Sequence, residues 1–232
     1  MSTENVKNNS TRGELKLLGA VEAFRFDFRG KTVLDIGSST GGFTEVALKK
    51  GAEKVIAVEK GTNQMKAPLR YDPRIELHEK TDIFDVTLKC LNDFSRGRSG
   101  ALAQVLSSSK NVQAFQPNHK RPSKDCLLKS PIDVVLADVS FVSLRPILLK
   151  AKELTGKKAE FLVMLKPQFE AKPEQLVKGV VKNEKIRREI IKDFEKWLIE
   201  NNFVILNKRD NQLAGKNGNK ERFYLLKLAQ KT

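Results

Sequence analysis

The chain has 232 residues, of which 40% are hydrophobic and 31% charged, a composition typical of a globular protein with one hydrophobic core. Its 43 Lys and Arg residues against 28 Asp and Glu give a formal net charge of +15, which favours a polyanionic partner such as nucleic acid. Two cysteines are too few for a disulfide framework or a zinc site, and no apolar run is long enough for a membrane span, so the sequence predicts a cytoplasmic protein with no membrane partner.

The first predicted element is a helix over residues 14–26, where apolar residues recur at helical spacing. Residues 1–11 before it are polar and are expected to form a flexible tail. The helix face expected to be buried carries Leu15, Leu18, Val21 and Ala23 or Phe24.

Strand-like and helix-like segments then alternate, which predicts an α/β, Rossmann-like fold with a mostly parallel sheet and helices on both faces. The last two strands are separated only by a loop, so the C-terminal strand is expected to be antiparallel. Predicted strands cover residues 31–37, 54–59, 75–80, 132–141, 159–167, 203–210 and 222–229, and predicted helices cover residues 42–51, 63–70, 144–154 and 184–202.

Residues 92–130 interrupt this alternation. They are rich in Ser, Lys, Arg and Asn, and their apolar residues are scattered. The pattern predicts an insertion in a domain that covers residues 12–232. A solvated loop is the favoured interpretation of the insertion, and an arm that contacts RNA is the alternative.

The segment DIGSSTGG, residues 35–42, ends a predicted strand and opens a helix. Its small residues allow a ligand to approach the backbone N–H groups closely. No Lys-Ser/Thr follows the last glycine, which argues against a nucleoside triphosphate, and the glycine spacing differs from that of dinucleotide-binding proteins. Asp35 would repel a pyrophosphate and attract a cation, such as the amino group or sulfonium of S-adenosylmethionine. The residues predicted to line this part of the site are Asp35, Gly37, Ser38, Gly41, Gly42 and Phe43.

Two further acids follow the next predicted strands. Glu59 ends the second strand about twenty residues after the loop, where a carboxylate can accept hydrogen bonds from both ribose hydroxyls. Asp82 lies near the end of the third strand, where it can meet the adenine amino group. The simpler alternatives are a surface acid for Glu59 and a helix cap for Asp82. Together with the loop, the two acids favour an S-adenosylmethionine site over a nicotinamide site.

Six motifs occur in the order TRGELKLLGAVEAF, VLDIGSSTGGFTEVAL, DVVLADVSFVSL, FLVMLKPQFEA, KGVV and GKNGNKERF. In this order they resemble the hemolysin A-like (TlyA) branch of the FtsJ-type ribose methyltransferases, over nearly the whole chain apart from the tail and the insertion. The resemblance implies S-adenosylmethionine-dependent 2′-O-methylation of a ribose in ribosomal RNA, with ribosomal RNA or ribosomal subunits as the partner. Members of this branch usually begin with a small RNA-binding domain, which this sequence is expected to lack.

The resemblance also implies a Lys-Asp-Lys-Glu catalytic set, which falls on Lys16, Asp138, Lys166 and Glu221. A ribose hydroxyl must lose its proton as it attacks the methyl group, so a lysine can serve as a neutral acceptor or as a hydrogen-bond donor to the forming alkoxide. Asp138 would orient Lys166 and hold the positive methyl donor, while Lys16 and Glu221 would position the hydroxyl. Taken singly, Lys16 is better explained as a solvated charge and Glu221 as an acid at a hairpin edge, and Asp138 could equally be a turn former.

Two other functions are consistent with parts of the pattern. A non-catalytic RNA- or ribosome-binding protein could retain the same fold, although the presence of the acids and lysines described above argues against it. A methyltransferase for small molecules is disfavoured by the net charge of +15, because a small substrate needs no extended basic face. No metal is expected, because His78 and His119 are not spaced as ligands.

Overall fold

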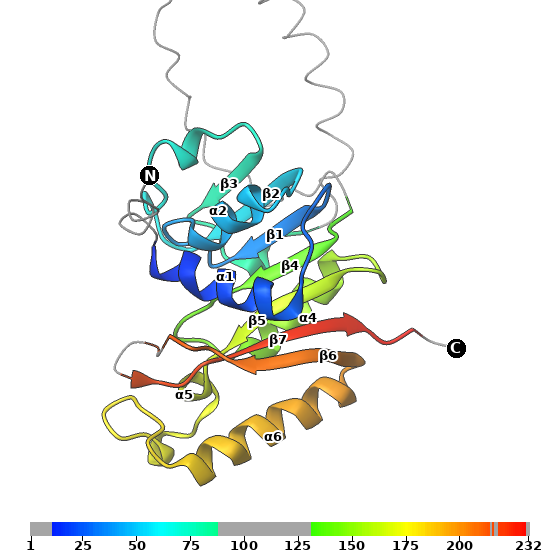
Figure 1. Cartoon of the computed structure of the whole chain (residues 1–232). Helices are drawn as coiled ribbons and strands as arrows, with labels where there is room; N and C mark the ends of the chain where they lie inside the picture. The colour runs from blue at the N-terminus through cyan, green and yellow to red at the C-terminus, as the bar shows by residue number, and fades with distance from the viewer. Residues whose placement is uncertain (1–10, 88–130, 214, 216–217, 231–232) are drawn as a thin grey trace, which may run out of the picture. The chain divides into compact units, whose positions relative to one another are not determined.

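The computed structural model describes residues 11–87, 131–213, 215 and 218–230 (Figure 1). The chain divides into two compact units, one formed by Met1–Ile83 with Ile132–Thr232 and the other by Phe84–Pro131. The predicted insertion and most of the predicted tail lie outside the described residues. Most of the second unit also lies outside them, so the description below concerns the first unit.

Seven strands form one sheet in the order β3-β2-β1-β4-β5-β7-β6 (Figure 1). The first five pair in parallel, and β7 is antiparallel to both β5 and β6. This topology confirms the predicted mostly parallel sheet with an antiparallel C-terminal strand. The strands are β1 (Thr32–Ile36), β2 (Lys54–Glu59), β3 (Ile75–Glu79), β4 (Val134–Ala137), β5 (Glu160–Leu165), β6 (Phe203–Asp210) and β7 (Arg222–Leu228).

The central strands β1, β4 and β5 are buried along almost their whole length and are mostly apolar, rich in Val and Leu, because both faces of the sheet are covered. Three of the helices that cover it begin at residues whose side chains accept backbone N–H bonds, namely Thr11 before α1, Ser143 before α4 and Asn183 before α6. The α-helices are α1 (Arg12–Phe24), α2 (Gly42–Lys49), α4 (Leu144–Leu154), α5 (Pro167–Glu170) and α6 (Glu184–Glu200), and short 3-10 helices are η1 (Leu69–Tyr71), η2 (Ile83–Asp85) and η4 (Pro173–Gln175).

Alternate side chains of β7 show which helices cover which face. Phe223 packs on Phe43 of α2 with ring centroids 6.1 Å apart, in a core cluster that also contains residues of α1. Tyr224 points to the opposite face, where its ring centroid lies 5.6 Å from that of Phe194 of α6. Arg145 of α4 lies over the same Phe194 ring at 5.9 Å. Helices α1 and α2 therefore cover one face and α4 and α6 the other, as predicted.

Two predictions about the helices were wrong in detail. In α1 the core-facing apolar residues include Leu17 and Ala20, whereas Leu15 is 48% exposed. The buried face differs from the predicted one because α1 also packs on α2 and because it buries the charged Lys16. The spacing of apolar residues reveals neither of these. The predicted helix over residues 63–70 is reduced to the 3-10 helix η1, in keeping with a proline at position 68.

The carboxyl ends of β1, β2, β4 and β5 lie at one edge of the sheet because these strands are parallel. Strand β7 runs the other way, so its first residue, Arg222, lies at that same edge. Among the described residues, no helix combines the length and apolar character needed to cross a bilayer. The carboxyl edge is where open parallel sheets bind their ligands, and the predicted site residues gather there.

Candidate active site

The loop after β1 is held against two other parts of the chain. Gly37 has a φ of 78°, and a Cβ atom on it would lie 3.3 Å from the carbonyl oxygen of Asp138. A Cβ atom on Gly42 would come within 2.6 Å of Thr11 Oγ1 at the start of α1. Glycine at these two positions therefore allows the loop to pack between α1 and the end of β4. Gly41, with a φ of 94°, precedes α2 as its N-cap residue.

Asp35 at the end of β1 is almost completely buried, with 1% of its surface exposed. Thr44 donates a hydrogen bond from Oγ1 to Asp35 Oδ2 over 2.6 Å. The other carboxyl oxygen, Oδ1, has no hydrogen-bond donor within the described parts of the chain. Burial raises the pKa of Asp35 to about 7, and the hydrogen bond from Thr44 opposes this shift. The site therefore contains one buried acceptor that a cationic group would satisfy.

Glu59 at the end of β2 closes the other side of the loop. Its Oε2 accepts a hydrogen bond from the Ser39 backbone N–H at 2.8 Å, and its Oε1 accepts one from the Gly61 N–H at 2.6 Å. Oε1 also accepts a hydrogen bond from the Gln64 side-chain amide over 3.3 Å, so Oε2 is the oxygen that can accept a further bond. Glu59 forms no ion pair with a described residue. Glu59 thus fixes the loop and retains acceptor capacity for hydroxyl groups.

The remaining residues predicted to bind the cofactor have different surroundings. Asp82 forms an ion pair with Lys60 over 2.9 Å. Ser38 is buried, and its hydroxyl has no hydrogen-bond partner among the described residues. The ring of Phe43 points into the core toward Phe223 and not into the loop. Phe43 therefore stabilises the loop by packing in the core against Phe223.

Lys166 follows β5 directly, and its side chain is buried beside the ends of β4 and β5. Its Nζ lies 2.7 Å from Asp138 Oδ1 and donates a hydrogen bond to Ser140 Oγ over 2.8 Å. Lys166 is 8% exposed, so little water competes for these contacts. Of these two contacts only the one to Ser140 is a hydrogen bond, because Asp138 Oδ1 has no hydrogen-bond partner among the described residues and meets Lys166 as an ion pair. The ammonium group therefore retains hydrogens that can be directed at a substrate oxygen.

Lys16 and Glu221 form a second buried pair. The Nζ of Lys16 donates to Glu221 Oε2 over 2.6 Å, across 205 residues of sequence. Both side chains are less than a tenth exposed. The simpler alternatives for these two residues, a solvated helix charge and an exposed hairpin acid, are inconsistent with this burial.

Strand register brings the two pairs together. Leu165 of β5 is paired with Arg222 of β7 in the antiparallel ladder. The next residues outward, Lys166 and Glu221, therefore leave the sheet side by side. All four residues of the predicted catalytic set thus lie in one cluster at the carboxyl edge, next to the loop that contacts Asp138 through Gly37.

Two aromatic residues at this edge were not predicted. Phe141 is 90% exposed and has a φ of 65°, a conformation that few non-glycine residues adopt. Its ring centroid lies 5.4 Å from that of Phe169, whose ring in turn lies 5.9 Å from Lys166 Nζ. The sequence signal was the aromatic residue three positions after Asp138 in a predicted strand, but its exposure is visible only in the structure.

A protein-family model described as FtsJ-like methyltransferase matches residues 10–228. The chain belongs to the FtsJ-like methyltransferase family. This membership confirms the resemblance that the six sequence motifs indicated. It also accounts for the glycine loop, the carboxylate at the end of β2 and the buried lysines, which all lie at the carboxyl edge of the sheet.

Two curated relatives of this FtsJ-like chain are similar along most of its length. The 16S/23S rRNA (cytidine-2'-O)-methyltransferase TlyA of Mycobacterium tuberculosis is 30% identical over 218 residues, which cover 94% of this chain and 68% of that protein. The 23S rRNA (cytidine-2'-O)-methyltransferase TlyA of Campylobacter jejuni is 31% identical over 216 residues, which cover 92% and 69%. A solved structure named as a hemolysin from Lactococcus lactis is 32% identical, with a TM-score of 0.72, and the match covers 94% of this chain and 87% of that one.

Proposed function

We propose that this chain uses S-adenosylmethionine to methylate a ribose 2′-hydroxyl in ribosomal RNA. The observation that carries the proposal is the buried Lys166–Asp138 contact, with Lys16 and Glu221 beside it, at the sheet edge that also carries the glycine loop. The names of the two curated relatives support the same activity.

The residues around the loop fit S-adenosylmethionine. The unsatisfied Oδ1 of buried Asp35 provides a negative or acceptor atom behind the loop, which suits the cationic methionine end of the cofactor. Glu59 has acceptor capacity for the ribose hydroxyls. When bound there, S-adenosylmethionine supplies an electrophilic methyl group on a sulfonium.

The Lys166–Asp138 pair would activate the attacking hydroxyl. A free hydrogen of Lys166 Nζ can bond to the ribose 2′-oxygen and hold it in line for attack. Asp138 Oδ1 lies close enough to Lys166 Nζ to accept a proton from it. If Asp138 took up that proton, the lone pair of Nζ would accept the proton of the 2′-hydroxyl while the methyl group passes from the sulfonium sulfur to the ribose oxygen.

The second pair would set the position of the RNA. Glu221 lies beside Lys166 across the β5–β7 ladder and is itself fixed by Lys16. The exposed ring of Phe141 lies beyond this cluster and offers a surface on which an unpaired base can stack. The net charge of +15 would hold the phosphate backbone around these groups.

The decisive experiment maps ribose methylation in ribosomal RNA by mass spectrometry, from cells with and without this protein. We expect one or more 2′-O-methyl groups to disappear when the protein is absent and to return when the wild-type chain is supplied. The Lys166→Met variant should not restore them. An unchanged methylation map, together with tight binding of labelled S-adenosylmethionine, would instead show a non-catalytic protein that retains the fold.

A further inference from the structure

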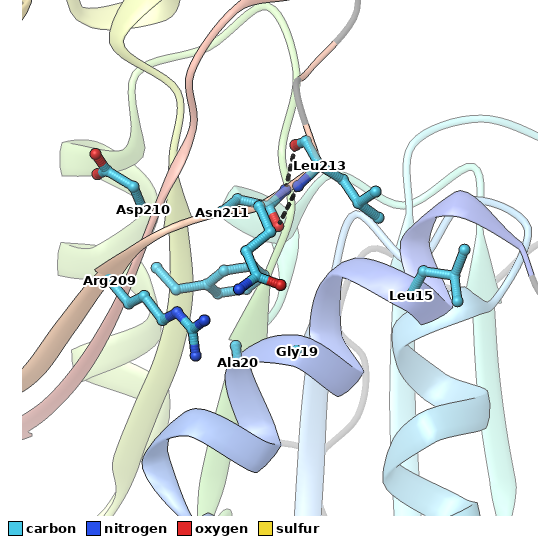
Figure 2. Close-up of a pocket in the computed structure, with 9 residues that line it drawn as sticks. Leu15, Gly19, Ala20, Arg209, Asp210, Asn211 and Leu213 are labelled. Carbon is cyan, nitrogen blue, oxygen red and sulfur yellow. Dashed lines mark hydrogen bonds between the residues drawn. The ribbon is translucent and has the colours of Figure 1, made fainter.

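A groove lies beside the catalytic cluster on the α1 face of the sheet (Figure 2). Its volume is about 240 Å³. One wall is α1, and the other is the end of β6 with the turn that follows it. The residues that matter for its chemistry are Leu15, Gly19 and Ala20 of α1, Arg209 and Gln212 of the opposite wall, and Phe223 of β7.

The groove is physically connected to the catalytic cluster. Ala20 lies one helical turn after Lys16, on the same side of α1. On the opposite wall, the Asn211 backbone N–H donates to the carbonyl oxygen of Glu221 over 2.9 Å. The Asn211 side chain then donates to the Leu213 carbonyl oxygen over 2.8 Å, which fixes the turn (Figure 2). Both walls are therefore held by the residues that flank the Lys16–Glu221 pair.

Gly19 borders space in the groove that no described residue fills. It lies inside α1, where glycine is less stable than alanine. A Cβ atom at this position would meet nothing within 4 Å. No described neighbour therefore explains why this helix position lacks a side chain, and an occupant of the groove would explain it.

The polar groups of the groove are available for a ligand. Arg209 and the Gln212 side chain are exposed, and neither forms an ion pair or a side-chain hydrogen bond within the described parts of the chain. Asp210 between them is instead paired with Arg187 and Arg222 and points away from the groove (Figure 2). The groove thus combines apolar walls with a guanidinium and an amide.

We propose that this groove binds the base of an unpaired nucleotide close to the methylated one in the same RNA strand. A nucleobase has apolar faces that suit the exposed side chain of Leu15, above a floor formed by the nearly buried Ala20 and Phe223. Its polar edge matches the donors of Arg209 and the donor and acceptor of the Gln212 amide. The cationic guanidinium and the net charge of +15 favour this occupant over an uncharged peptide. The inference rests on the proposed RNA ribose methylation.

The test fills the groove at Gly19. The Gly19→Met variant adds a side chain where no described atom lies, and Gly156→Met, at an exposed glycine before β5 whose Cβ atom would also meet no described atom, is the matched control. The substrate is ribosomal subunits from cells that lack this protein, with tritiated S-adenosylmethionine as the donor. We expect Gly19→Met to lower kcat/KM by about tenfold through a higher KM for subunits, as for the loss of one bound base. Gly156→Met should behave as the wild type, and calorimetry should give all three proteins the same cofactor affinity.

A crosslinking experiment identifies the occupant. Subunits that carry 4-thiouridine are irradiated with the wild-type protein, and the crosslinked peptides are identified by mass spectrometry. An RNA crosslink to residues 209–213 or 15–20 that is lost in Gly19→Met supports the proposal. A wild-type KM for Gly19→Met overturns it, and so does a raised KM without such an RNA crosslink, which would indicate a ribosomal protein in the groove. If the wild type binds the cofactor but transfers no methyl group to subunits, the proposed function itself fails, and this inference with it.

Discussion

The two halves of the site differ in how their acids are compensated. Around the loop after β1, Asp35 and Glu59 accept hydrogen bonds from neutral groups and form no ion pair with a described residue. At the ends of β5 and β7, each acid has a lysine, in the Lys166–Asp138 and Lys16–Glu221 pairs. The acidic half, with Asp35 and Glu59, has no cation to compensate its acids and suits a cationic cofactor. The balanced half, which consists of the two lysine–acid pairs, suits a neutral hydroxyl that must be oriented. The predictions below test this division, from the largest expected effect to the smallest.

Replacing Lys166 tests whether the balanced half carries the chemistry. Lys166→Met should lower the single-turnover rate of methyl transfer by about a thousandfold, because the hydroxyl loses the group that orients and deprotonates it. The affinity for S-adenosylmethionine, measured by calorimetry, should not change. Lys158→Met is the matched control, since Lys158 is exposed and precedes the same strand at its opposite end. Equal rates for Lys166→Met and the wild type would remove Lys166 from the mechanism.

Breaking the second pair tests whether its charges depend on each other. Lys16→Met leaves Glu221 buried without its cation and should lower the free energy of unfolding by about 3 kcal/mol. The double variant Lys16→Met, Glu221→Met removes both charges and should be more stable than the sum of the single changes predicts. The exposed pair Lys196–Glu200 provides the control, where Lys196→Met should have little effect. Strictly additive losses in denaturant unfolding would contradict the coupling.

Replacing Glu59 tests the acidic half. Glu59→Ala should weaken S-adenosylmethionine binding by roughly ten- to a hundredfold, as for the loss of a charged hydrogen bond. The rate of transfer at saturating cofactor should fall much less, because Glu59 lies at the end of β2, away from the lysine pairs. Glu53→Ala, at an exposed position before β2, is the control. Unchanged affinity in calorimetry would exclude Glu59 as a cofactor ligand.

The exposed ring of Phe141 is expected to act on RNA alone. Phe141→Ala should raise the KM for ribosomal subunits by about tenfold through loss of stacking. Phe141→Trp should retain activity because it keeps an aromatic face. Neither change should alter cofactor affinity or stability, since the side chain is 90% exposed. A normal KM for Phe141→Ala would show that the base stacks elsewhere.

The raised pKa of Asp35 predicts that the stability of the chain depends on pH. Its pKa of about 7 in the folded chain lies above the ordinary value of 3.8 for an aspartate, so the folded state holds a proton that the unfolded state has released between these values. The contribution of Asp35 therefore falls as the pH rises from about 4 to about 7. Asp35→Asn cannot titrate, so its unfolding free energy relative to the wild type should increase over this range. Parallel pH profiles for the two proteins in urea unfolding would contradict the burial of an ionisable Asp35.

The acidic half was the part that local sequence could indicate. Asp35 and Glu59 each end an apolar strand, and the contacts that hold them come from residues within a short stretch of chain, such as Thr44 and Ser39. A strand followed by small residues and a helix determines this geometry through the backbone alone. The burial of Asp35, and hence its raised pKa, still required the packed structure.

The sequence determined the strands, most of the helices and their alternation, because a buried parallel sheet requires continuous runs of Val, Ile and Leu. It indicated Lys16, Asp138, Lys166 and Glu221 as a catalytic set only through the resemblance, since taken singly Lys16, Asp138 and Glu221 each had a simpler interpretation. Only the tertiary structure decided that Lys16 is buried against Glu221, that Leu15 is exposed, and that Gly19 faces open space. These features depend on how α1 packs on the sheet and on the position of the antiparallel β7 between β5 and β6. Such contacts join residues up to 205 positions apart, so no local pattern of apolar spacing encodes them.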